Sequence, residues 1–208
     1  MNIIREACVG SVEEAMIAEI RKADRVELCS RLDLDGLTPD RKIIERTMNL
    51  LSIPIKVMIR PKSGNFNYSK QDILKMESEI DFCKNIGVSE VVFGILNKNS
   101  EVDIELTSAI AKKAAPMDIT FHKAIDHVSD IEGNLERLSN VKGVTSILTS
   151  GGKDSALNGQ DMIKDIIKQF SSRFKIIAAG GITDKNLNLV HSCINSTEYH
   201  GKRIVGQL

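Results

Sequence analysis

Short runs of apolar residues alternate along the whole chain with longer stretches in which apolar residues recur every three or four positions. The short runs are rich in β-branched residues and predict buried strands, whereas the longer stretches have the period of amphipathic helices. Eight strands are predicted, over residues 3–8, 25–29, 55–59, 90–96, 118–122, 144–148, 175–179 and 196–200. The repeating unit is therefore a strand followed by a helix.

The helical pattern is clearest between residues 69 and 87. Ile73, Met76, Ile80 and Cys83 recur at steps of three and four, which places them on one apolar stripe, and Gly87 suits a left-handed stop. Similar patterns predict helices over 103–114, 130–138, 160–170 and 184–191.

Three polar motifs mark predicted helix starts. Ser11 with Glu14 and Ser129 with Glu132 have the spacing of a capping box, in which the serine oxygen and the glutamate satisfy free amides. Thr38 precedes a proline, whose missing amide proton costs nothing in a first helical turn.

This alternation predicts one domain over residues 1–208, built from parallel strands and right-handed crossovers. Eight strands favour a TIM-type (β/α)8 barrel over a doubly wound open sheet, because no G-x-G-x-x-G follows the first strand. The sequence stops eight residues after His200, so the barrel is a short form lacking the last long helix. We expect a partner subunit to cover the flank beside the first helix, which predicts a homodimer or higher homo-oligomer.

Charge and composition narrow the classes of partner. The 208 residues carry 28 Lys+Arg and 28 Asp+Glu, so the positive surplus that nucleic-acid binding needs is absent. Charged residues such as Arg5 and Glu13 interrupt any signal-peptide core, and no transmembrane stretch is present. The sequence predicts a cytoplasmic protein whose four widely spaced cysteines are thiols.

Polar residues gather at or just after the predicted strand ends, where barrels of this type build their active sites. The candidate catalytic residues are Glu6, Glu27, Arg60, His122 and Asp126. Each alone is equally consistent with an internal ion pair or a helix cap. Together they favour a functional pocket, because so many buried titratable groups would otherwise have to satisfy one another.

Cys8 and Cys29 stand at the ends of consecutive strands, which lie about 4.8 Å apart in a sheet. Three interpretations stay open: a thiolate pair that binds Cu(I), a disulfide, or inert packing. Cys83 and Cys193 fall on predicted helices and are expected in the core.

Glycines follow the last two strands, at Gly180, Gly181 and Gly201. Glycine lets backbone amides approach a ligand, and barrels often bind phosphate in these loops, so these are candidate cofactor-binding positions. An ordinary tight turn is the alternative.

Several sequence blocks, taken in order, resemble the signature of the copper homeostasis protein CutC family. They are Glu6-Ala7-Cys8-Val9, Arg25-Val26-Glu27-Leu28-Cys29, Gly36-Leu37-Thr38-Pro39, Met58-Ile59-Arg60-Pro61, Thr120-Phe121-His122-Lys123-Ala124-Ile125-Asp126, Leu148-Thr149-Ser150-Gly151 and Gly180-Gly181-Ile182. The resemblance implies a TIM-type barrel in the cytoplasm that binds Cu(I), with Cys8 and Cys29 as the ligands, often as a dimer or higher oligomer. Lys62 and Lys123 replace arginines of the family pattern and lose the bidentate guanidinium fork.

Two functions are thus predicted. The first is Cu(I) binding and copper homeostasis through a thiolate pair at the barrel mouth. The alternative is a metal-independent lyase, isomerase or hydrolase acting on a small anionic or phosphorylated metabolite, with His122 or Glu27 as acid or base and Arg60 holding the anion.

Overall fold

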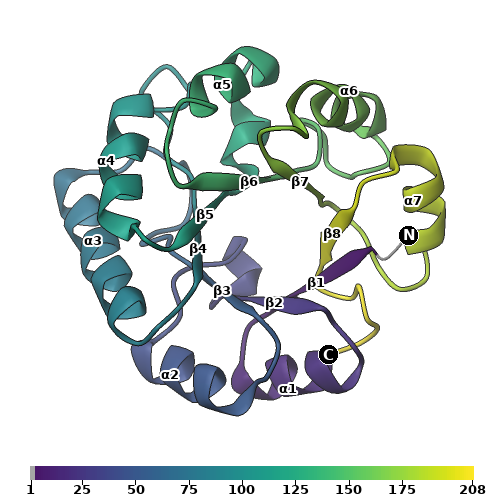
Figure 1. The fold of residues 1–208 in the computed structure, drawn as a ribbon, viewed down its shortest axis with the longest axis horizontal. Coiled ribbons are helices and arrows are strands. Elements are labelled where there is room, and N and C mark those ends of the chain that lie inside the picture. The colour runs from purple at the N-terminus through teal and green to yellow at the C-terminus, as the bar shows by residue number, and fades with distance from the viewer. Residues whose placement is uncertain (1–2) are drawn as a thin grey trace.

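The computed structural model describes residues 3–208 and contains a closed barrel of eight parallel strands in chain order, surrounded by helices (Figure 1). The strands are β1 (Ile4–Val9), β2 (Arg25–Leu28), β3 (Ile55–Met58), β4 (Glu90–Phe93), β5 (Asp118–Phe121), β6 (Val144–Thr149), β7 (Lys175–Ala178) and β8 (Glu198–Gly201). The barrel closes where β1 pairs with β8, with Ile4 opposite Glu198. The TIM-type fold and all eight predicted strands are confirmed.

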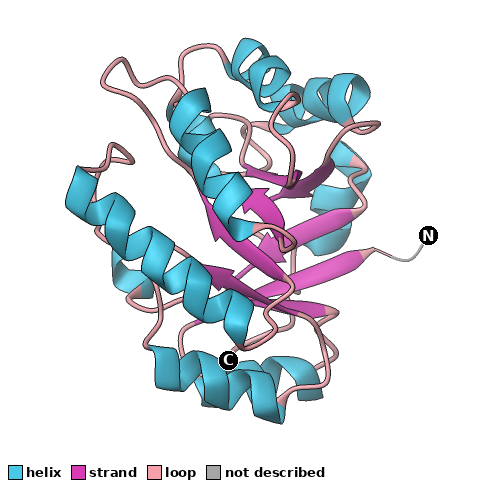
Figure 2. Ribbon diagram, turned by 60° about the vertical axis from the view of Figure 1, so that its left-hand side comes forward, coloured by secondary structure: helices cyan, strands magenta, loops and turns pink. Residues whose placement is uncertain are grey.

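Seven α-helices are present among residues 3–208: α1 (Val12–Ile20), α2 (Arg41–Leu50), α3 (Lys70–Asn85), α4 (Ile104–Ala114), α5 (Ile131–Leu138), α6 (Gln160–Phe170) and α7 (Leu187–Ile194). Two 3-10 helices, η1 (Leu32–Leu34) and η2 (Lys123–His127), were not predicted. Viewed from the side, the helices pack along the outer face of the strands (Figure 2). As expected, no long helix follows β8 among these residues; the buried side chains of Ile204 and Val205 join the main core there instead.

Some predicted helix starts were wrong by one to three residues. The cap of α5 is Asp130 rather than Ser129, the cap of α2 is Asp40 rather than Thr38, and α7 begins at Leu187 instead of 184. Ser11 does cap α1, but the carboxylate of Glu14 accepts from the amide of Gly10, so the capping box is incomplete.

The prediction for α3 was accurate. Ser69 and Asp72 form a full capping box, Met76, Ile80 and Cys83 are buried, and Gly87 has a φ of 84°. Cys193 lies in α7 and is partly buried against the core, also as predicted.

Candidate functional site

A cavity of about 360 Å³ opens at the carboxyl ends of the strands. Its wall includes eight of the ten predicted site residues and several residues that the sequence did not single out. The predicted ones are Cys8, Glu27, Cys29, Arg60, His122, Gly180, Gly181 and Gly201; the others include Asp35, Met58, Phe66, Lys123, His127, His200 and Lys202.

Arg60 is one of these eight predicted residues, and its guanidinium already forms hydrogen bonds within the protein. It donates to the backbone carbonyls of Leu34, Asp35, Gly36 and Gly64, at 2.9 to 3.1 Å. The guanidinium therefore ties down the loops after β2 and β3, while its Nε–H has no hydrogen-bond partner among residues 3–208.

The structure does not bring Glu6 or Asp126 to the cavity wall. Asp126 accepts hydrogen bonds from the Thr149 and Ser150 hydroxyls and from the amides of Ser150 and Gly152. Its carboxylate thus joins η2 to the loop after β6. These contacts match the structural alternative considered for each polar residue rather than a catalytic one.

Glu6 lies inside the barrel below the cavity, in a network of buried charges. Its carboxylate pairs with Arg25, lies 3.2 Å from the Lys56 ammonium and 2.7 Å from Nδ1 of His200. Burial alone would raise the pKa of Glu6, but Lys56, His200 and Arg25 hold it well below its usual range. The network continues from Arg25 to Glu198 and from Lys56 to Glu90. Glu6 is therefore a supporting carboxylate that positions His200.

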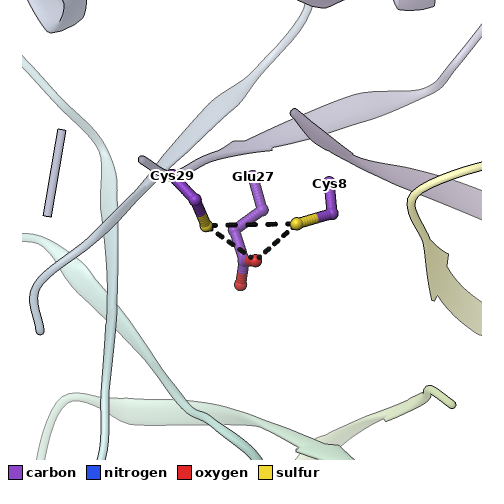
Figure 3. A group of neighbouring side chains, drawn as sticks. All are labelled: Cys8, Glu27 and Cys29. Atoms are coloured by element: carbon purple, nitrogen blue, oxygen red, sulfur yellow. Dashed lines mark hydrogen bonds between the residues drawn. The ribbon is translucent and has the colours of Figure 1, made fainter. Parts of the chain in front are cut away.

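Three side chains from the first two strands meet at the wall: Cys8, Glu27 and Cys29 (Figure 3). The two sulfurs are 4.0 Å apart, and Oε2 of Glu27 lies 3.6 Å from Cys8 Sγ and 3.4 Å from Cys29 Sγ. Met58, at the end of β3, packs in the same small cluster as Cys29 and Cys8. Sulfur atoms from three consecutive strands thus lie on one side of the mouth.

The strand register changes the expected backbone distance between the cysteines. Cys8 is opposite Glu27, not Cys29, so Cys29, which directly follows β2, stands two residues further along the chain and the Cα separation is about 8 Å. Disulfides normally join Cα atoms about 4.4 to 6.8 Å apart, so a bridge here would require the backbone to move. The expectation that the spacing suits a disulfide was wrong, and all four cysteines are free thiols.

The pKa shifts in this cluster favour a negatively charged Cys8 thiolate beside a positively charged His200. The hydrogen bond from Cys29 is the largest cause that lowers the pKa of Cys8, to about 5, and the contact with His200 adds to it. The Cys29 thiol has its pKa raised well above the usual value, first by the same hydrogen bond and then by burial. Burial opposes the charge on His200, but Glu27, Cys8 and Glu6 together raise its pKa well above 6.5. Cys8 is therefore the more readily ionised thiol.

Glu27 and His122 each present a buried polar atom without a hydrogen-bond partner among residues 3–208. These atoms are Oε1 of Glu27 and Nε2 of His122. Burial raises the pKa of Glu27 to about 8 and lowers that of His122 to about 3, so both groups favour their neutral forms. Unpartnered buried polar atoms beside a cavity are typical of ligand sites.

Sequence reasoning missed His200, Lys56 and Arg25 as members of the site and its support. His200 stood at a predicted strand end, which was a usable signal, but only barrel closure brings it beside Glu6. Lys56 and Arg25 occur early in their strands, where nothing in a linear pattern separates an inward-pointing cation from an exposed one.

Comparison with known proteins gives a consistent family assignment. The protein-family model described as "CutC family" matches residues 3–205 of this chain. The human protein "Copper homeostasis protein cutC homolog" is 40% identical over 199 residues, covering 96% of this chain and 72% of that protein. A CutC protein of Pasteurella multocida is 36% identical, covering 94% of this chain and 80% of its own length.

Solved structures agree at the level of the fold. A crystal structure of CutC from Streptococcus agalactiae superposes with a TM-score of 0.92 at 28% identity, covering 97% of this chain and 99% of that one. A dihydrodipicolinate synthase from Bacillus anthracis gives a TM-score of 0.69 at 11% identity, covering 97% of this chain and 70% of that one, and shows the shared barrel alone. No helix among residues 3–208 has the length and apolar character needed to cross a membrane.

Proposed function

Because this chain belongs to the CutC family, we propose that it binds Cu(I) through Cys8 and Cys29 and takes part in copper homeostasis. The observation that carries the proposal is the 4.0 Å separation of the two sulfurs at the cavity wall. Two metal–thiolate bonds of about 2.3 Å each, the length known for zinc, span up to about 4.6 Å, so one ion can reach both sulfurs.

The chemistry of the donor set supports a soft ion. Thiolates and thioethers select Cu(I), and Met58 adds a thioether to the same cluster. The Glu27 carboxyl is a harder ligand and is better suited to accepting or donating a hydrogen bond beside the sulfurs. A reducing cytoplasm, the location we propose, keeps both cysteines as thiols.

Anaerobic titration against a competing Cu(I) chelator tests this function. The parent protein is expected to withdraw copper from the chelator, and the Cys8→Ser, Cys29→Ser double variant to lose that ability. A Cys83→Ala, Cys193→Ala double variant is the matched control, because these thiols lie on α3 and α7 away from the cavity. Equal binding by the parent and the Cys8→Ser, Cys29→Ser variant would show that the ligands are assigned wrongly.

A second function is favoured by the size and lining of the cavity. A volume of about 360 Å³ is within the range of small-molecule sites and far exceeds one metal ion. Its wall carries the neutral groups of Glu27 and His122 as well as Lys123 and Lys202. We therefore also propose a metal-independent enzyme acting on a small anionic metabolite.

Native mass spectrometry of the protein purified without added metal distinguishes these two functions. A bound small organic anion that is released on denaturation supports the enzyme, whereas copper retained in proportion to intact Cys8 and Cys29 supports the metal site. A protein that carries neither, and that turns over no anionic metabolite in an extract of small molecules, would contradict the enzymatic proposal.

A further inference from the structure

His122 lines the cavity and has a buried ring nitrogen without a hydrogen-bond partner among residues 3–208. The side chain follows β5, is only 4% exposed and forms part of the cavity wall. Its Nδ1 accepts a hydrogen bond from the amide of Ala124 at 3.1 Å, so the ring also caps η2. Nε2 has no partner among residues 3–208. One nitrogen of the ring thus has a partner and the other has none.

The hydrogen bond from Ala124 determines which nitrogen carries the proton. Because Nδ1 accepts, a neutral imidazole here must hold its hydrogen on Nε2. Burial and the nearby Arg60 guanidinium lower the pKa of His122 to about 3, which keeps the ring neutral near pH 7. Phe66 packs against the ring, with centroids 4.9 Å apart. The neutral ring of His122 is therefore suited to donate a hydrogen bond through Nε2–H.

Two lysines line the same cavity. Lys123 follows His122 directly, and Lys202 follows β8, next to the wall formed by Gly180 and Gly181. Neither lysine forms an ion pair within residues 3–208. Gly180 needs to be glycine because its φ is 103° and a Cβ would come within 3.0 Å of the Ser150 side chain. Asp35 is an acidic group on the same wall.

We propose that the cavity binds a small carbonyl compound with an anionic end, and that Nε2–H of His122 donates a hydrogen bond to the carbonyl oxygen. This inference rests on the second function proposed above and names the class of its ligand. A neutral imidazole donor of this kind polarises the substrate carbonyl in triosephosphate isomerase. A ligand without the oxygen would leave a buried donor unpaired, which lowers affinity by about 10-fold. Lys123 and Lys202 bind the anionic end.

Calorimetric titration with two matched pairs of probes tests the proposal: pyruvate against propionate, and dihydroxyacetone phosphate against propyl phosphate. The carbonyl member of at least one pair is expected to bind about 10-fold more tightly than its partner. The pair that shows this difference identifies the anionic end as a carboxylate or a phosphate. Equal affinities within both pairs, or no binding of any probe, would overturn the proposal.

The His122→Asn variant keeps a side-chain oxygen that can accept from the Ala124 amide, but its shorter side chain places no donor at the position of Nε2. It should abolish the difference within the discriminating pair and leave propionate or propyl phosphate binding unchanged within about twofold. His127→Asn, which alters another histidine of the cavity wall, is the control and should keep the difference. Retention of the difference in His122→Asn would refute the role of this ring.

The proposal remains testable if His122→Asn does not fold. In the parent protein labelled with ¹⁵N-histidine, the His122 signals should show the Nε2–H tautomer, and Nε2 should shift when the carbonyl probe is added. An Nδ1–H tautomer would contradict the inference. Carbonyl discrimination without any turnover would leave the ligand assignment intact and remove the enzymatic function, so the two failures are distinguishable.

Discussion

Lys56 lies inside the barrel, 1% exposed, with its ammonium between two carboxylates. It is 3.2 Å from Glu6 and 2.8 Å from Glu90, and it donates to the hydroxyl of Thr120 at 2.8 Å. Removing one partner of a buried ion pair leaves the other charge uncompensated, which usually costs about 3 to 5 kcal/mol. Lys56→Met is therefore expected to lower the free energy of unfolding by about that amount.

Urea denaturation measures this effect. Lys98→Met is the matched control, because Lys98 is exposed and such a substitution usually changes stability by less than about 0.5 kcal/mol. Equal midpoints for the two variants would show that the network inside the barrel tolerates the loss of its central cation.

The buried, neutral His122 also makes stability depend on pH. Its pKa is about 3 in the folded protein and 6.5 in an unfolded chain, so below pH 6.5 the unfolded state takes up a proton that the folded state excludes. The contribution is fully present above pH 6.5 and is lost as the pH falls toward 3, by about 1.4 kcal/mol per pH unit.

The comparison with His122→Asn isolates this contribution, because the other titrating groups are common to both proteins. Between pH 7 and pH 5 the parent should lose about 2 kcal/mol more stability than the variant. Parallel stability curves, measured by chemical denaturation over this range, would contradict a neutral buried imidazole.

At the residue scale, the sequence located eight residues of the cavity wall but not the geometry that gives each residue its role. Strand ends converge in any parallel barrel, so Cys8, Glu27, Cys29 and His122 could be expected at one mouth. The diagonal placement of Cys29 depends on the β1–β2 register, which no local pattern specifies. Asp126 was predicted at the same mouth, but its carboxylate instead accepts hydrogen bonds from residues 149–152.

At the scale of elements, the assignment of Asp130 as the cap of α5 can be tested directly by substitution. The Asp130 side chain accepts from the amide of Gly133, whereas Ser129 is exposed and is not the cap. Loss of a capping oxygen costs about 1 kcal/mol. Asp130→Ala should therefore lower the free energy of unfolding by about 1 kcal/mol, and Ser129→Ala should leave it nearly unchanged. Thermal or urea unfolding of both variants measures this difference. A larger loss of stability in Ser129→Ala than in Asp130→Ala would identify Ser129 as the cap.

Element types were predictable because hydrophobic period differs sharply between strands and helices, but the caps depended on tertiary contacts. Thr38 illustrates this point: its hydroxyl accepts from the amide of Arg60 on the neighbouring strand connection, so the helix start passes to Asp40. Where capping was purely local, as for Ser69 and Asp72 in α3, the sequence motif was sufficient.

At the scale of the whole molecule, the homo-oligomer expected from the sequence stays a prediction. Exposed apolar side chains on α1 support it: Ile20 is 73% exposed and Met16 41% exposed. We propose that a second copy of the chain covers this helix. Sedimentation at micromolar concentration should then show a dimer or larger assembly, which Ile20→Lys shifts toward the monomer. Leu74→Lys, on α3, is the control for an exposed leucine outside this face. A monomeric parent protein would contradict the prediction.

The pairing of β1 with β8 has a consequence for how the protein is made. Chains fold as they leave the ribosome from the amino terminus onward, so β1 must wait for the strand synthesised last. Until then Arg25 lacks Glu198, one of its two carboxylate partners, and Glu6 lacks His200. A nascent chain stalled before residue 198 therefore has neither a closed sheet nor a complete site. Such a chain exposes unpaired strand edges, which favour aggregation, so closure of the barrel depends on the synthesis of β8.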